Sequence, residues 1–140
     1  MDWEAAGRWQ SLINNVQIGK CANMQMKKFC LALDLKDDPD LIAEYENYHK
    51  NVWPEIIKSI KDSGIVLLDI YRSGNRMFMI IEANENFSFE KKAARDAANP
   101  KVQEWEKLMW KFQQALPGAK PGEKWILMEK IFELPVTGNQ

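Results

Sequence analysis

Cysteine, histidine and long apolar runs are all scarce in this chain of 140 residues. Its two cysteines, Cys21 and Cys30, are too few for a disulfide scaffold and lack the spacing of metal ligands, which favours a reduced, cytoplasmic compartment. No apolar run approaches the roughly 18 residues that a membrane-spanning helix requires. We therefore expect neither a disulfide-rich secreted protein nor a membrane protein.

An excess of positive charge is also missing. The chain has 19 basic and 20 acidic residues and a formal net charge of −1, so no basic patch indicates nucleic acid as a partner. It contains no glycine-rich phosphate loop, no HExxH or CxxC motif and no nucleophile elbow. The single histidine, His49, excludes a cluster of histidine ligands within one chain. We expect no metal and no cofactor.

The chain divides into two parts. In residues 1–26, apolar side chains recur every three or four positions up to Gly19, which predicts an N-terminal helical extension that packs on the domain or on a neighbouring subunit. Partial disorder of this extension is the alternative. Residues 27–140 are expected to form a single α+β domain, because this length supports one hydrophobic core.

Within that domain, turn residues separate short apolar runs from segments with helical periodicity. Strands are predicted at 27–35, at 65–72 and 76–83 around the turn Ser73-Gly74-Asn75, and at 124–134. One helix is predicted from Leu41, capped by Asp40, with an interruption at Trp53-Pro54 and an end at Gly64. Two more helices are predicted at 87–98 and, after the cap Asn99, at 100–116.

The order strand, helix, strand, strand, helix, strand is typical of the ferredoxin-like split βαβ fold. It predicts a four-stranded antiparallel sheet with helices on one face. The other face of the sheet would expose apolar side chains, and a two-fold dimer would cover it. We therefore expect a homodimer.

Tyr45, His49 and Trp53 are spaced four residues apart, which places consecutive members on one face of a helix. An imidazole exchanges protons near neutral pH, and a phenol and an indole beside it form a wall that can hold a sugar. The alternative is that all three are ordinary packing residues, which is common for aromatic side chains at helical spacing.

Sequence motifs along residues 27–135 resemble the L-rhamnose mutarotase family. The similarity begins with YxxxHxxxWPE from Tyr45 to Glu55, continues through GIxxxxIY at 64–71, GNRMFMIIE at 74–82 and QEWEKLMWKF at 103–112, and resumes in EKWILMEKIFELP at 123–135. The resemblance implies a ferredoxin-like α/β barrel that dimerises. It also implies a cofactor-free isomerase that interconverts the α and β anomers of a 6-deoxy-L-hexose, with L-rhamnose as the first choice, by general acid/base opening and closing of the ring.

The resemblance also implies roles for individual residues. His49 matches the family's proton donor, and Tyr45 matches a tyrosine that contacts substrate. Trp53 matches the tryptophan of the WPE segment, where an anchoring role in the fold is equally compatible, and Trp105 matches the first of two adjacent tryptophans at the sugar site. Glu106 occupies the position of the second tryptophan, where it could hydrogen-bond a sugar hydroxyl.

A second departure from the family is Leu68, which replaces a tyrosine, while Tyr71 should point to the opposite face of the sheet. Both departures lie in the wall that selects the sugar, so L-fucose is the alternative substrate. Asp69 and Glu82 are candidates for a second acid or base, although charges on strand rims are commonly solvated. Functions of another class remain open, namely a small-molecule binding module or a cofactor-free oxygenase on the same fold.

Overall fold

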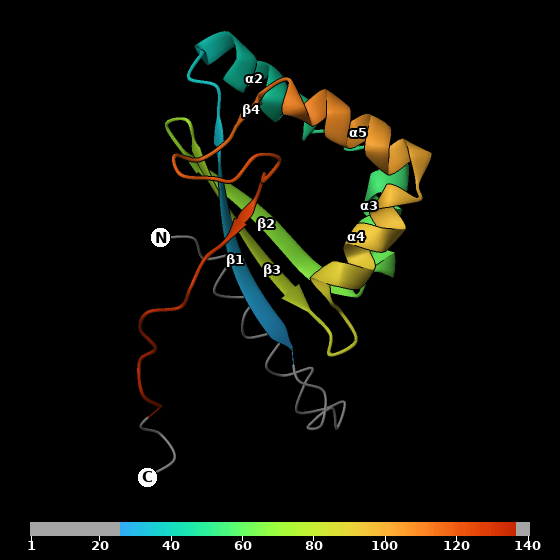
Figure 1. Ribbon diagram of the computed structural model, residues 1–140, viewed down its shortest axis with the longest axis vertical. Coiled ribbons are helices and arrows are strands. Elements are labelled where there is room, and N and C mark those ends of the chain that lie inside the picture. The colour runs from blue at the N-terminus through green and yellow to red at the C-terminus, as the bar shows by residue number, and fades with distance from the viewer. Residues whose placement is uncertain (1–25, 137–140) are drawn as a thin grey trace.

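A computed structural model of the protein describes residues 26–136 (Figure 1). Its sheet contains three long and two short strands, which are β1 (Lys27–Leu35), β2 (Ile65–Ser73), β3 (Arg76–Ala83), β4 (Gln113–Gln114) and β5 (Ile126–Leu127). The order is β2-β3-β1-β4, β5 also pairs with β1, and every pairing is antiparallel. The helical extension expected over 1–26 lies outside the described residues, apart from Met26.

The four helices of the described residues lie together on one side of this sheet, as Figure 1 shows. They are α2 (Pro39–Tyr48), α3 (Pro54–Asp62), α4 (Phe89–Ala97) and α5 (Pro100–Trp110). The predicted α+β architecture, with an antiparallel sheet and helices on one face, is therefore confirmed. None of the helices within residues 26–136 is long and apolar enough to cross a bilayer.

Helix boundaries follow from capping residues. Asp38, and not Asp40, caps α2, because its Oδ1 accepts hydrogen bonds from the backbone N–H groups of Asp40 at 2.9 Å and Leu41 at 3.3 Å. The predicted interruption at Trp53-Pro54 is confirmed, since α2 ends at Tyr48 and α3 starts at Pro54. Asn99 caps α5 as predicted, through its Oδ1 and the N–H groups of Lys101 and Val102.

The predicted bounds were wrong near the C-terminus. The last helix ends at Trp110 instead of continuing to 116, and Gln113 and Gln114 pair with β1 as the short strand β4. This turn places Phe112 in the core, where only 3% of it is exposed, so burial overrides the helical periodicity.

The strand expected over 124–134 forms ladder pairs only at Ile126 and Leu127. One further bond follows, from Met128 N–H to the Cys30 carbonyl at 2.7 Å, and the chain then leaves the domain (Figure 1). Its apolar side chains contact little of the described chain, with Ile131 93% and Leu134 75% exposed. The pattern predicted the strand at Ile126 and Leu127, but within residues 26–136 no neighbouring strand pairs with it along the full predicted length.

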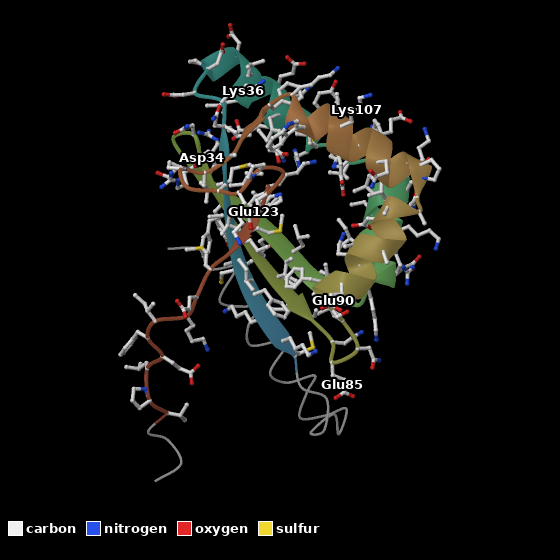
Figure 2. All side chains as sticks on the ribbon, viewed as in Figure 1. Asp34, Lys36, Glu85, Glu90, Lys107 and Glu123 are labelled. Carbon is white, nitrogen blue, oxygen red and sulfur yellow. The ribbon has the colours of Figure 1, made fainter. Side chains whose placement is uncertain are left out.

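The core lies between the sheet and the helices. Leu33, Leu35 and Met77 are fully enclosed at the end of the sheet near α2 and α5, and Phe87 is enclosed at the opposite end. Beside the first of these groups lies Asp34 of β1, which Figure 2 labels. It accepts two hydrogen bonds from the Arg76 guanidinium, at 2.7 and 3.0 Å. The two residues face each other in the β1–β3 ladder, so the bidentate pair holds the register of these strands.

Candidate active site

A cavity of about 990 Å³ separates the central strands from the helices. Its wall is mainly apolar and is built from β1, β2, β3 and all four helices, together with the segment just before β5. The cavity opens to solvent. Its volume lies at the upper end of the range of about 300–1,000 Å³ that is usual for small-molecule sites.

His49 reaches this cavity from the C-terminal end of α2. Its Nδ1 lies 2.9 Å from the backbone carbonyl oxygen of Tyr45, one turn earlier in the helix. Because a carbonyl oxygen can only accept a hydrogen bond, Nδ1 must carry a hydrogen and donate it. In the neutral imidazole, Nε2 is then the ring nitrogen without a hydrogen, as in other sites where a backbone group selects the tautomer.

Tyr45 lies directly beside His49, with the two ring centres 4.5 Å apart, and is only 4% exposed. Its hydroxyl oxygen accepts a hydrogen bond from Nε2 of Gln113 at 3.2 Å. Burial raises the pKa of the Tyr45 phenol, and the bond from Gln113 offsets this only in part. Tyr45 therefore keeps its proton at neutral pH and can donate it to a ligand oxygen.

The aromatic wall on the other side of His49 comes from α5. Trp105 is 8% exposed, lines the cavity, and packs with its ring centre 5.7 Å from that of His49. Glu106 follows it and lines the same cavity. The structure thus brings Tyr45, His49, Trp105 and Glu106 to one space.

Trp53 occupies a different position. It packs against Trp105, with the ring centres 5.0 Å apart, and does not contribute to the cavity wall. Its backbone carbonyl accepts hydrogen bonds from the N–H groups of Ile56 and Ile57 at the start of α3. These contacts make Trp53 a support behind Trp105 and the first turn of α3.

Gln113, Lys124 and Trp125 are among the cavity residues that sequence reasoning missed. Gln113 lines the cavity only because the chain turns out of α5 into β4, and Trp125 lines it only because β5 pairs beside β1. The available signals were the unusual count of six tryptophans, of which Trp125 is the last, and the motif EKWILMEKIFELP, which contains Lys124 and Trp125.

Asp69 and Glu82, the candidate second acid or base, are directed away from the cavity. Leu68, Ile70, Met79 and Ile81 line it, so by strand alternation their neighbours Asp69 and Glu82 lie on the opposite face of the sheet. Tyr71 lies on that outer face too, 57% exposed, as predicted from its spacing to Leu68.

Metal-ligand chemistry has no counterpart in this arrangement. Within residues 26–136, no three histidine, cysteine, aspartate or glutamate side chains gather closely enough to hold a metal ion. The site offers one proton-exchanging nitrogen, one protonated phenol, an indole wall and a carboxylate. This set can bind a partly apolar polyhydroxylated molecule and move a proton on it.

The fold and the cavity together define a ferredoxin-like α+β protein with a cavity of small-molecule size between its sheet and its helices. Residues 28–134 match the family model described as L-rhamnose mutarotase. The chain belongs to the L-rhamnose mutarotase family.

Individual relatives agree with this assignment. An L-fucose mutarotase of Xanthomonas campestris pv. campestris is 50% identical over 113 residues, which cover 79% of this chain and 90% of that protein. An L-rhamnose mutarotase of Acidiphilium cryptum is 27% identical over 109 residues, or 75% of this chain and 97% of that protein. The crystal structure of an L-rhamnose mutarotase from Formosa agariphila shares the fold, with a TM-score of 0.57 and 21% identity over 78% of this chain and 99% of that one.

Proposed function

We propose that this protein, a sugar isomerase of the mutarotase family, interconverts the α and β anomers of a 6-deoxy-L-hexose. The observation that carries the proposal is the hydrogen bond from His49 Nδ1 to the Tyr45 carbonyl. It leaves Nε2 as the exchanging nitrogen of a histidine that lines the cavity beside an indole.

In ring opening, Nε2 of protonated His49 donates its proton to the ring oxygen. The bond between that oxygen and the anomeric carbon breaks, and its electron pair stays on the oxygen. A water molecule in the open cavity takes the proton of the anomeric hydroxyl, whose electrons form the aldehyde. After rotation about the adjacent carbon–carbon bond, the same steps in reverse close the ring on the other face of the aldehyde. General acid–base assistance of this kind accelerates a reaction by about 10²–10⁴-fold.

Neighbouring side chains hold the sugar during this exchange. The Tyr45 phenol, which burial keeps protonated, donates to a sugar oxygen. The Trp105 indole packs on the deoxy methyl group and the ring C–H groups. Glu106 accepts a hydrogen bond from a hydroxyl, and Trp53 acts on the sugar only through its contact with Trp105.

L-Fucose is the sugar that we place first, with L-rhamnose second. Identity is 50% to the L-fucose mutarotase and 27% to the L-rhamnose mutarotase described above, which reverses the order expected from the motifs. The two sugars differ in hydroxyl configuration, and Glu106 supplies an acceptor where the resemblance placed a second indole. A carboxylate discriminates between hydroxyl directions more sharply than an aromatic face does, because its hydrogen bonds are directional.

The test is NMR exchange spectroscopy on L-fucose, L-rhamnose and D-glucose at anomeric equilibrium. We expect faster exchange of L-fucose with the wild-type protein than with His49→Gln, and none above background for D-glucose. Equal exchange with both proteins would overturn the proposal. A pure binding module would show sugar binding without exchange, and an oxygenase would consume oxygen with an activated aromatic substrate.

We also propose that the protein is a homodimer. Phe78 and Ile80 lie on the sheet face opposite the helices, and beyond β5 the exposed apolar side chains of Ile131, Phe132 and Leu134 extend from the domain. A second copy of the chain would cover both surfaces. Sedimentation equilibrium should give twice the chain mass, and Ile80→Lys should shift the protein toward monomer. A wild-type monomer at micromolar concentration would contradict this assignment.

A cytoplasmic location is proposed on the cysteine content, since Cys30 is a free thiol and the chain has only one other cysteine. Cell fractionation of the native protein tests it, and recovery in a secreted fraction would overturn it.

A further inference from the structure

A second polar cluster lines the same cavity, away from His49. It combines Ser59 of α3, Lys92 and Asp96 of α4, and Gln103 of α5. The Ser59 hydroxyl donates to Asp96 Oδ1 at 3.2 Å, and Lys92 Nζ lies 2.5 Å from Asp96 Oδ2. Gln103 Nε2 donates to the Asp96 backbone carbonyl at 2.9 Å. Side chains from three helices thus meet at one residue of the cavity wall, Asp96: Ser59 and Lys92 at its carboxylate and Gln103 at its backbone carbonyl.

The stability of α4 does not account for this ion pair. Asp96 is 8% exposed, and a buried pair usually stabilises a protein no better than apolar side chains of similar size. Asp96 also lies in the last turn of α4, where the helix dipole disfavours a negative charge. With lysine four residues before the acid, the pair has the less favourable orientation for a helix.

The cluster retains hydrogen-bonding capacity that its members do not use among themselves. Lys92 has N–H groups beyond the one directed at Asp96, and each Asp96 oxygen keeps a further lone pair. The Gln103 side-chain oxygen and the Ser59 hydroxyl oxygen can both accept. An adjacent carboxylate and ammonium suit neighbouring hydroxyls, which donate to the first and accept from the second.

The cavity wall therefore has two polar regions, one at His49 and one at the Asp96 cluster. Apolar side chains, among them Ile56, Ile60 and Val102, make up the rest of the wall. A free monosaccharide is smaller than the ligands that usually occupy about 990 Å³. Resting on the mutarotase activity proposed above, we infer that Ser59, Lys92, Asp96 and Gln103 form a subsite for a second hydroxylated unit. The substrate class then includes reducing disaccharides with a 6-deoxy-L-hexose at the reducing end. The second unit must be attached at a non-anomeric hydroxyl, because ring opening requires a free anomeric hydroxyl.

The experiment compares free L-fucose with disaccharides that carry a second hexose at each non-anomeric hydroxyl of L-fucose in turn. Anomer exchange at low sugar concentration gives kcat/KM for each. Lys92→Met/Asp96→Asn removes both charges, so that neither is left buried alone. We expect wild-type protein to turn over free L-fucose and at least one regioisomer. The double variant should lose about 10- to 100-fold in kcat/KM on that disaccharide, with free L-fucose unchanged.

Lys58→Met/Asp62→Asn is the matched control. This pair also has lysine four residues before aspartate and an N–O distance of 2.5 Å, but it is more exposed and does not line the large cavity. It should leave both substrates unaffected. The inference is overturned if free L-fucose is turned over and no disaccharide is, or if the Lys92/Asp96 variant slows both substrates equally. Absence of turnover of every free sugar would instead overturn the proposed function.

Discussion

Nδ1 of His49 lies 2.9 Å from the backbone carbonyl oxygen of Tyr45, so the side chain of one residue is oriented by the main chain of the other. The same two residues are in ring contact, and the Tyr45 hydroxyl is bound in turn by Gln113 of β4. A helix end and a short strand, distant in sequence, therefore together form the surroundings of the His49 ring. The predictions below test this site and its surroundings.

Replacing His49 with Gln should reduce anomer exchange by about 10²–10⁴-fold, because the amide cannot exchange a proton at neutral pH. Sugar affinity should change far less, since the aromatic wall remains. Exchange spectroscopy and calorimetric titration measure the two quantities. Lys50→Gln, an exposed neighbour, is the control and should retain full activity; loss of activity in both variants would point to damage at the end of α2.

Replacing Tyr45 with Phe should lower the free energy of unfolding by about 1–3 kcal/mol at pH 7, because buried Gln113 loses its acceptor. The pH dependence should change as well. The folded-state pKa of Tyr45 is raised above the ordinary value of about 10. The contribution of Tyr45 to the free energy of unfolding is therefore complete below about pH 10 and is lost as the pH rises through the folded-state pKa.

Urea unfolding from pH 7 to 11 should therefore show a steeper alkaline decline in the wild type than in Tyr45→Phe. Tyr71→Phe, at an exposed tyrosine, should follow the wild type. Superimposable profiles for wild type and Tyr45→Phe would contradict the burial argument.

Matched changes at two tryptophans should separate sugar contact from support. Trp105→Leu should raise KM about two- to tenfold, because the indole lines the cavity. Trp53→Leu should instead lower stability by about 1–3 kcal/mol with little change in KM. Initial-rate exchange measurements give KM, and urea unfolding gives the free energy of unfolding. A larger KM effect at Trp53 than at Trp105 would reverse the assigned roles.

Glu106→Trp should shift sugar preference toward L-rhamnose. Because the variant loses a charge-assisted hydrogen bond to L-fucose, the ratio of kcat/KM for L-fucose to that for L-rhamnose should fall by about 10- to 100-fold. Glu104→Trp introduces the same side chain at an exposed position of α5 and should leave the ratio unchanged. If the two variants give the same ratio, Glu106 does not select the sugar.

Gly64→Ala should destabilise the protein more than Gly118→Ala does. Both glycines have positive φ, +100° and +83°, which a side chain disfavours. At Gly64 an added Cβ would also lie 2.7 Å from Asn84 Oδ1, whereas at Gly118 it meets nothing within 4 Å. We expect the free energy of unfolding to fall by about 1–3 kcal/mol for Gly64→Ala and by less for Gly118→Ala, measured by urea unfolding. Equal losses would show that the Asn84 contact contributes nothing.

Local chemistry in the sequence was sufficient for the order of elements. Period-two and period-3.6 apolar patterns, the cap Asn99 and the break at Pro54 act within a few residues, so they predicted the fold class and most boundaries. The spacing of Tyr45 and His49 also made their shared helix face predictable, because one helical turn determines it.

Only the tertiary structure decided which residues share the cavity. Phe112 ends α5 early to reach the core, and that turn brings Gln113 to Tyr45 across 68 positions of sequence. Strand pairing brings Trp125 to the cavity and directs Asp69 and Glu82 away from it. In the part of the chain that the structure describes, residues 129–136 have no strand partner. These outcomes depend on burial and pairing between distant segments, whose free energy no local pattern encodes.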